Sequence, residues 1–294
     1  MVSTGSQDAD LGVAVVTDTT AYLPDELVAQ YGITVVPLRV AIAGKYFDEG
    51  SAAPADMVAD ALRRHIPIST SRPNPQVFAT TYQRLADQAS AVVAIHLCSE
   101  MSGTYEAAML AAREASLPVR VVDSRSLGMG LGFAVLDAAA MALAGAGPDE
   151  VVAAAQHRMA RTSVFFYVDT LEYLHRGGRI GAAATVLGSA FAIKPLLHLV
   201  DGRIELLEKV RTASRAIDRL TAIAVARAGE TDVDIAVHHL AHASQAENLA
   251  SQLRTRISWV DQVYVREVGA VVGAHVGPGM LAVVVSPHSE ATRH

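Results

Sequence analysis

The chain has 294 residues, 51% of them hydrophobic, and a formal net charge of −6. This composition supplies a large buried core, and it argues against a basic surface that would bind nucleic acid or an anionic membrane. The single cysteine, Cys98, excludes a disulfide within the chain and fits a reducing compartment.

Apolar runs of strand length alternate with helix-length segments in the first half of the chain. We expect strands at 11–16, 33–36, 38–43, 91–97 and 119–123, and helices after Pro24, over 54–64, from Pro75 to about 88, over 102–115 and over 129–143. The weakly polar stretch 127–147 carries Asp137 at its middle, so it is predicted to be a buried helix. No signal peptide is evident at the N-terminus. We therefore expect a cytoplasmic protein without stable membrane insertion.

Gly145 to Pro148 separate this half from a second one, which opens with a helix at Pro148. Further strands are predicted at 164–168, 233–238, 260–265 and 280–286, with helices at 182–192 and 244–256. Asp201-Gly202 lies between the apolar runs 195–200 and 204–210 and predicts a β-hairpin. The pattern predicts an α/β protein of two lobes. The first, 11–160, has a mainly parallel sheet flanked by helices, and the second, 161–294, has a mixed or antiparallel sheet.

Two hydroxyl-rich segments are candidates for anion binding. One contains Thr70 and Ser71 just before Pro73, and the other contains Ser102, Gly103 and Thr104 after the strand at 91–97. Hydroxyls and free N–H groups at helix starts bind anions, and open α/β sheets bind ligands at the carboxyl ends of their strands. Ordinary helix capping is the favoured explanation of the Thr70 segment taken alone and explains the Ser102 segment as well as anion binding does. Convergence of two such segments at one end of the sheet favours a functional role for both. Neither has the partners that a hydrolase needs.

Other polar segments leave alternatives open. Arg176 and Arg179 lie in a glycine turn that is either a solvated loop or an anion clamp or partner surface. His275, between glycines, either faces a ligand or is structural. His238 and His242 have the spacing of metal ligands, but no third ligand is evident and we expect no metal. The glycines at 128, 130 and 132 fit a dinucleotide fingerprint poorly, so we interpret them as helix packing or a pocket wall.

Taken in order, these segments resemble the DegV family over nearly the whole chain. The likeness rests on V-T-D-T-T at 16–20, T-S-x-P at Thr70, S-G-T-Y at Ser102, V-D-S at 122–124, the run 168–180, Lys194-Pro195, Asp201-Gly202, K-V-R-T at 209–212 and H-V-G-P-G at 275–279. Each motif is weak by itself, and the ordered set is specific.

The resemblance implies a two-domain protein that binds one long-chain fatty acid in an apolar tunnel between its lobes. Positions matching Thr70 and Ser102 would hold the carboxylate, with Ser71, Gly103, Thr104 and His275 beside them. Arg179 and Arg176 would contact the anion or a partner. Such proteins present the fatty acid to a separate ATP-dependent fatty acid kinase. The resemblance thus implies a non-catalytic carrier without a cofactor, and we expect a monomer.

The sequence departs from the family pattern before S-G-T, where Cys98-Ser99-Glu100-Met101 replaces the common Ser-Ser-Gly-Leu. Because Glu100 would repel a bound carboxylate, we predict that it faces solvent. Arg72, often glutamine in relatives, would help hold the anion or make a surface contact. Candidate tunnel residues are Leu131, Phe133, Phe191 and Leu196.

Two other functions stay open at this stage. The first is a hydrolase or phosphotransferase that uses Ser102 with His275. It requires the two side chains within about 2.6–3.2 Å of each other and a third group that orients the histidine. The second is a regulatory sensor whose partner binding depends on lipid occupancy.

Overall fold

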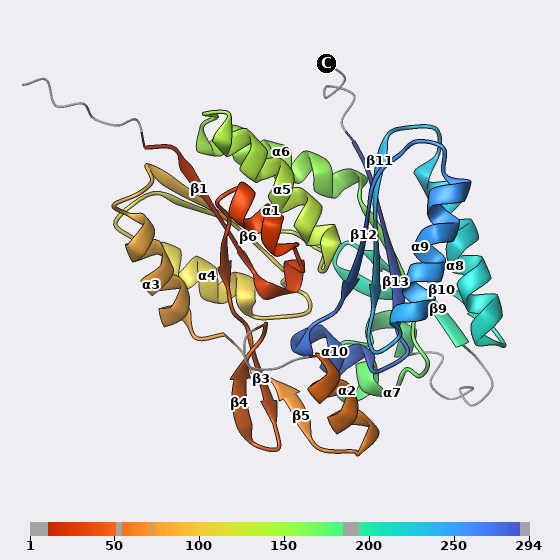
Figure 1. The fold of residues 1–294 in the computed structure, drawn as a ribbon. Helices are drawn as coiled ribbons and strands as arrows, with labels where there is room; N and C mark the ends of the chain where they lie inside the picture. Colours follow the sequence, from red (N-terminus) through yellow and green to blue (C-terminus); the bar gives the residue numbers. More distant parts are fainter. Residues whose placement is uncertain (1–10, 51–54, 72, 185–193, 289–294) are drawn as a thin grey trace, which may run out of the picture.

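The structure is a computed structural model that describes residues 11–50, 55–71, 73–184 and 194–288, and Figure 1 shows its arrangement. The described strands are β1 (Val13–Asp18), β2 (Thr34–Val36), β3 (Arg39–Ile42), β4 (Lys45–Asp48), β5 (Ile68–Thr70), β6 (Ala91–His96), β7 (Val119–Asp123), β8 (Ser163–Tyr167), β9 (Lys194–Val200), β10 (Arg203–Val210), β11 (Val233–His239), β12 (Val260–Glu267) and β13 (Leu281–Pro287). The described helices are η1 (Thr19–Ala21), α1 (Asp25–Gln30), α2 (Ala55–Arg63), α3 (Pro75–Leu85), α4 (Thr104–Ala112), α5 (Met129–Leu143), α6 (Pro148–Arg161), α7 (Glu172–Arg176), α8 (Ala213–Ala228), α9 (Ala243–Arg256) and α10 (Ala270–Val276).

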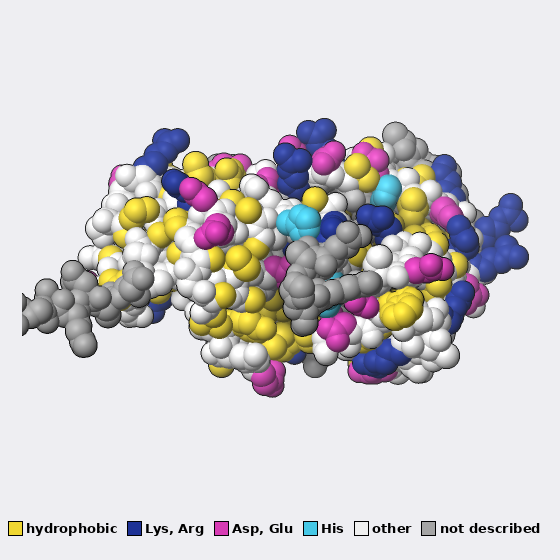
Figure 2. Space-filling view, turned by 90° about the horizontal axis from the view of Figure 1, so that it is seen from above, with side chains coloured by type: hydrophobic (Ala, Val, Ile, Leu, Met, Phe, Trp, Pro, Cys, Tyr) yellow, Lys and Arg dark blue, Asp and Glu magenta, His cyan; other side chains and the backbone are white. Residues whose placement is uncertain are grey.

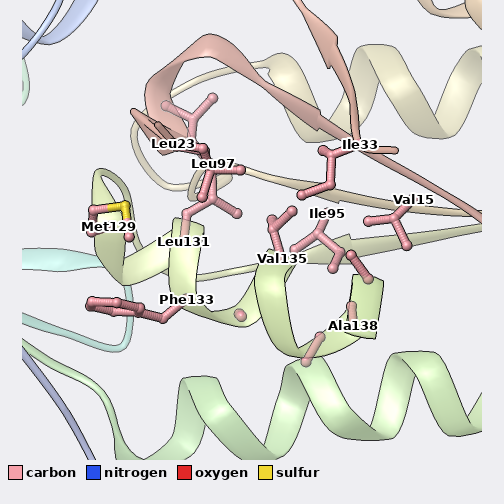
Figure 3. Packing of buried hydrophobic residues seen from close by; sticks show 14 of the residues in the cluster. Val15, Leu23, Ile33, Ile95, Leu97, Met129, Leu131, Phe133, Val135 and Ala138 are labelled. Atoms are coloured by element: carbon pink, nitrogen blue, oxygen red, sulfur yellow. The ribbon is translucent and has the colours of Figure 1, made fainter. Parts of the chain in front are cut away.

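The first half of the chain forms a parallel sheet in the order β2-β1-β6-β7, which confirms the predicted architecture. Alternate residues of its strands face opposite layers, because side chains alternate across a strand. Val15 and Ile95 pack against α5, as Figure 3 shows, whereas Val16 and Ala94 pack in the cluster under α3 and α4. Burial on both faces explains why 91–97 reads as an unbroken apolar run.

The second half forms a six-stranded sheet in the order β10-β9-β8-β13-β11-β12. Its strand pairs are antiparallel except β11 with β12, so the predicted mixed sheet is confirmed. The predicted Asp201-Gly202 hairpin joins β9 to β10. Both turn residues have positive φ, 48° and 80°, the geometry that asparagine, aspartate and glycine tolerate best. Helices α8 and α9 cover one face of this sheet (Figure 1).

A small antiparallel sheet, β4-β3-β5, was not expected from the sequence. Its strands have three or four residues each, too few for a clear alternation of apolar and polar side chains. Helices α2 and α10 pack against it, and Thr70 is the last residue of β5. The sheet therefore places one hydroxyl-rich segment beside the C-terminal part of the chain.

Four of the described helices were also not predicted: η1, α7, α8 and α10. His275, whose role the sequence left open, is in the last turn of α10. The helix predicted over 182–192 lies almost wholly outside the described residues.

The stretch 127–147 forms α5, whose side chains from Met129 to Ala139 are mostly buried against the parallel sheet (Figure 3). Within the described ranges, no helix combines the length and the apolar character needed to cross a membrane. Acidic and basic side chains are interspersed with hydrophobic ones over the face shown in Figure 2.

Candidate functional site

One cavity collects most of the residues predicted to bind an anion. Both halves of the chain build it, since β5, the start of α4 and the loop before α5 face β8, β9 and α10. Most of its lining is aliphatic or aromatic, and examples are Phe166, Val272 and Met280. The polar lining residues include Thr70, Ser71, Ser102, Arg179 and His275. Gly103, the N-cap residue of α4, lines the cavity beside Ser102.

Thr70 and His275 are joined by a hydrogen bond although 205 residues separate them. The distance from Thr70 Oγ1 to His275 Nε2 is 2.9 Å. Burial, with a smaller contribution from the charge of Arg179, lowers the pKa of His275 to about 4. The imidazole is therefore neutral at pH 7. Its buried Nδ1 has no hydrogen-bond partner among the described residues.

The glycines around His275 allow α7 and α10 to approach closely. A Cβ at Gly177 would stand 2.2 Å from His275 Nδ1, and a Cβ at Gly277 would stand 2.1 Å from the ring of Tyr173. Gly277 also has φ of 76°, which favours glycine. The glycine-rich segments at 177 and 277 thus serve the placement of His275.

Ser102 and Thr104 lie at the start of α4, where Gly103 is the N-cap residue and provides no side-chain cap. Ser102 and Gly103 line the cavity, and Ser102 Oγ lies 2.8 Å from Thr104 Oγ1. Thr104 itself is fully buried and is not among the lining residues. Thr104 therefore orients Ser102, whereas the predicted direct contact of Thr104 with the ligand has no support in the geometry.

Arg179 crosses from the turn after α7 to the segment before α4. Its Nε donates to the carbonyl of Met101 at 3.0 Å, and its Nη1 donates to the carbonyl of Gly177 at 2.6 Å. Two bonds hold the guanidinium at the cavity wall. Arg176 differs, because it is exposed, pairs with Glu172 at 3.7 Å and lies over the ring of Tyr173. It does not line the cavity.

The predicted tunnel residues are not the ones that line this cavity. Leu131 packs in the core under the parallel sheet (Figure 3), Phe133 packs between α5 and Tyr264 of β12, and Leu196 packs under α8. Their long apolar side chains are equally suited to a core, so composition could not separate the two roles. Phe191 and Arg72 lie outside the described residues.

The contacts required for a serine–histidine nucleophile are not made by the described residues. Ser102 is bonded to Thr104 and His275 to Thr70. No described group accepts from or donates to His275 Nδ1, whereas a catalytic histidine has a third group there that fixes its orientation. The arrangement can hold an anion, but among the described residues His275 lacks the third group that would orient it as a general base.

His238 and His242 are held by the protein rather than directed at a shared point. Nε2 of His238 accepts from the N–H of Met129 at 2.9 Å, and its Nδ1 lies 3.2 Å from the carbonyl of Arg266. His242 Nδ1 lies 3.2 Å from the carbonyl of Gly279. Among the described residues, the group spaced to hold a metal ion is a different one, Asp234, Asp261 and His288.

The prediction that Glu100 faces solvent is confirmed. Glu100 is exposed and pairs with Arg203 at 3.1 Å, away from the cavity lining. Cys98 is fully buried, its thiol lies 3.1 Å from the carbonyl of Gly202, and burial raises its pKa to about 11. Cys98 is thus a structural thiol beneath the β9–β10 turn.

Glu49 supports the site and was missed by the sequence analysis. Glu49 is 3% exposed, and its carboxylate accepts from the N–H of Val271 at 2.8 Å, at the start of α10. It also accepts from Thr19 Oγ1 at 2.6 Å, and burial raises its pKa. Glu49 therefore ties the helix that carries His275 to the end of β1. Nothing in its sequence neighbours signals this role.

Known proteins resemble the chain over nearly all of its length. A family model described as an uncharacterised protein of the DegV family matches residues 12–288. A DegV domain-containing protein of Streptomyces coelicolor is 56% identical over 275 residues, which cover 93% of this chain and 98% of that protein.

Two solved structures share the fold. One is described as fatty acid binding of a DegV family protein from Thermus thermophilus. It has a TM-score of 0.89 and 30% identity, and the match covers 94% of this chain and 100% of that chain. The other is described as DegV, a fatty acid binding protein from Bacillus subtilis. Its TM-score is 0.87 and its sequence identity is 29%, and the match covers 95% of this chain and 100% of that chain.

Proposed function

Because this chain belongs to the DegV family, we propose that it binds one long-chain fatty acid in the cavity that both halves of the chain line. The carboxylate lies at Thr70, Ser71 and Ser102, and the acyl chain lies along the apolar lining. The observation that carries the proposal is the convergence of these hydroxyls with Arg179 on an otherwise apolar cavity.

The chemistry of the lining matches the two parts of a fatty acid. Hydrogen bonds from hydroxyls or backbone N–H groups to a carboxylate are charge-assisted and strong, and the guanidinium of Arg179 supplies a positive charge nearby. Each acyl CH₂ removed from water contributes about 0.8 kcal/mol. The neutral imidazole of His275 adds no competing charge and is available to hydrogen-bond the carboxylate or the hydroxyl of Thr70.

In this proposal the protein is a carrier and not a catalyst. It presents the carboxylate to a separate ATP-dependent fatty acid kinase and needs no cofactor. The lobes 11–160 and 161–294 enclose the ligand, and Arg176, exposed outside the cavity, is a candidate contact for the kinase. We further propose that the carrier is a cytoplasmic monomer.

Native mass spectrometry followed by organic extraction tests the ligand class. We expect one fatty acid per chain, and about tenfold weaker binding in Ser102→Ala and in Thr70→Val, since each loses one hydrogen bond to a charged group. Ser69→Ala is the matched control, because Ser69 is exposed on the opposite face of β5. A protein that stays empty with a panel of fatty acids, or two variants that bind like the wild type, would contradict the proposed site.

The carrier role is tested by incubating the loaded protein with ATP, with and without the catalytic protein of a bacterial fatty acid kinase. Acyl phosphate is expected only when both proteins are present, because the described residues around Ser102 lack the contacts of a nucleophile. Turnover of acyl phosphate or acyl ester by this protein alone, lost in Ser102→Ala, would instead support the hydrolase or phosphotransferase.

A further inference from the structure

The cavity ends against a second hollow on the surface, and the two share two lining residues. The second hollow, called here the β7–α6 groove, is lined by β7, the loop after it and α6, including Asp123, Val152 and Met159. Val164 and Leu199 line both the cavity and this groove. Each of these side chains therefore has the cavity on one side and the groove on the other.

The loop before α5 forms the rest of the partition. Leu127 and Gly128 line the cavity, whereas Ser126 and Gly130 line the groove. The backbone of α5 touches Val164, because a Cβ at Gly130 would stand 2.9 Å from Val164 Cγ2. Val164 is also buried, with 9% of its surface exposed. The partition is thus packed, and Val164 has little freedom to move aside.

The strand β8 runs through this partition from the groove into the cavity. Thr162, Val164 and Phe166 are spaced by two residues and share one face: Thr162 lines the groove, Phe166 lines the cavity and Val164 lines both. Phe165 pairs with His198 and Phe166 with Leu197, so the same register puts Val164 opposite Leu199. The two shared side chains are cross-strand neighbours.

The direction of β8 also orients the cavity. After Tyr167 the chain continues to α7 and Arg179, so the polar groups lie toward the carboxyl end of β8 and Val164 lies toward its beginning. A fatty acid whose carboxylate is at Thr70 and Ser102 has its methyl end directed toward Val164 and Leu199.

We propose that Val164 and Leu199 form the end wall of the acyl cavity and set the longest acyl chain that this protein binds. The inference rests on the proposed function. A chain that reaches the wall stops there, and each further methylene has no apolar space to enter. Without the wall, the cavity joins the β7–α6 groove, whose partly apolar lining accommodates the end of a longer chain.

The test measures binding of a series of saturated fatty acids, two carbons apart in length, by native mass spectrometry competition. In the wild type, affinity rises about fourfold per added methylene up to a limit and then falls. We expect Val164→Ala and Leu199→Ala to move that limit upward by two carbons or more. We expect Val164→Ile, which adds a methyl group to the wall, to move it downward.

Two control variants separate the wall from general effects. Val272→Ala enlarges a side of the cavity that does not face the groove, so affinity should fall at all lengths with the limit unchanged. Val152→Ala changes the groove alone and should leave the series unaltered. Thermal unfolding confirms that each variant is folded.

The outcomes distinguish the wall from the proposed function. A wild type that binds members of the series, with the same limit in folded Val164→Ala and Leu199→Ala, would overturn the wall and leave fatty acid binding intact. A wild type that binds no member would overturn both. Opposite shifts in Val164→Ala and Val164→Ile would establish the wall.

Discussion

Replacing Arg158 with methionine is expected to lower the free energy of unfolding by about 3–5 kcal/mol, the usual cost of removing one partner of a buried ion pair. The Arg158 side chain, from α6, is 5% exposed and reaches strands β11 and β13 of the six-stranded sheet. It donates to the side chain of Ser286 at 2.6 Å and to the carboxylate of Asp234. Methionine fills the volume and leaves that carboxylate with His288, at 2.8 Å, as its only side-chain partner among the described residues. Urea unfolding of the two proteins measures the difference.

Arg120→Met is the control for this variant. Arg120 also pairs with an aspartate, Asp149, at 3.3 Å, but their side chains are 56% and 84% exposed. An exposed pair contributes about 0–1 kcal/mol. Equal losses of stability in the two variants would show that burial of Arg158 does not matter and would refute the prediction.

Gly177→Ala is expected to weaken fatty acid binding about a hundredfold while the protein stays folded. The new methyl group would occupy the position 2.2 Å from His275 Nδ1, so the imidazole has to move. Its bond to Thr70 then breaks, and two groups at the polar end of the cavity lose their positions. A hydrogen bond to a charged ligand contributes about 1.5 kcal/mol, which is about tenfold in affinity, so the loss of two such bonds lowers the affinity about a hundredfold.

Gly147→Ala is the matched control, because a Cβ there has only Glu150 within 4 Å, at 3.7 Å. Affinity for one fatty acid and the thermal unfolding midpoint are measured for both variants. Wild-type affinity in Gly177→Ala would show that the position of His275 is not needed for binding.

The two larger sheets and most helices could be predicted because local patterns determine them. The strand at 91–97 is apolar throughout because both of its faces are covered, and Asp201-Gly202 marks a turn whose positive φ angles few other residues accept. Helix α5 was predicted at its observed bounds, from an apolar stretch with an acid at its middle.

The elements that were missed depend on contacts distant in sequence. Helix α10 has seven residues between the capping glycines Gly269 and Gly277, and Glu49 accepts from the N–H of Val271 in its first turn. Strand β5 has three residues and exists by pairing with β3. Neither is long enough for propensity or periodicity to identify it, because short isolated helices and strands are unstable in water.

The candidate site was identified only through its motifs, and its contacts could not be. The bond between Thr70 and His275 spans 205 residues, and no local rule brings the two together. One missed cluster did leave a signal. Val151, Ala155 and Arg158 have the i, i+4, i+7 spacing of a buried helix face and all three are buried, so an arginine on that face required an internal partner.

Because both halves of the chain line the cavity, a ligand bound there changes the folding equilibrium of the protein, and with it the protein's resistance to proteolysis. A ligand that needs both walls binds the folded chain and not the unfolded one, so it favours folding by mass action. At a ligand concentration one hundred times the Kd this amounts to about 2.7 kcal/mol, a hundredfold smaller unfolded fraction. Proteases in the cell cut chains that open. On the proposed function, we expect loaded molecules to outlast empty ones and the amount of protein to follow the supply of fatty acid.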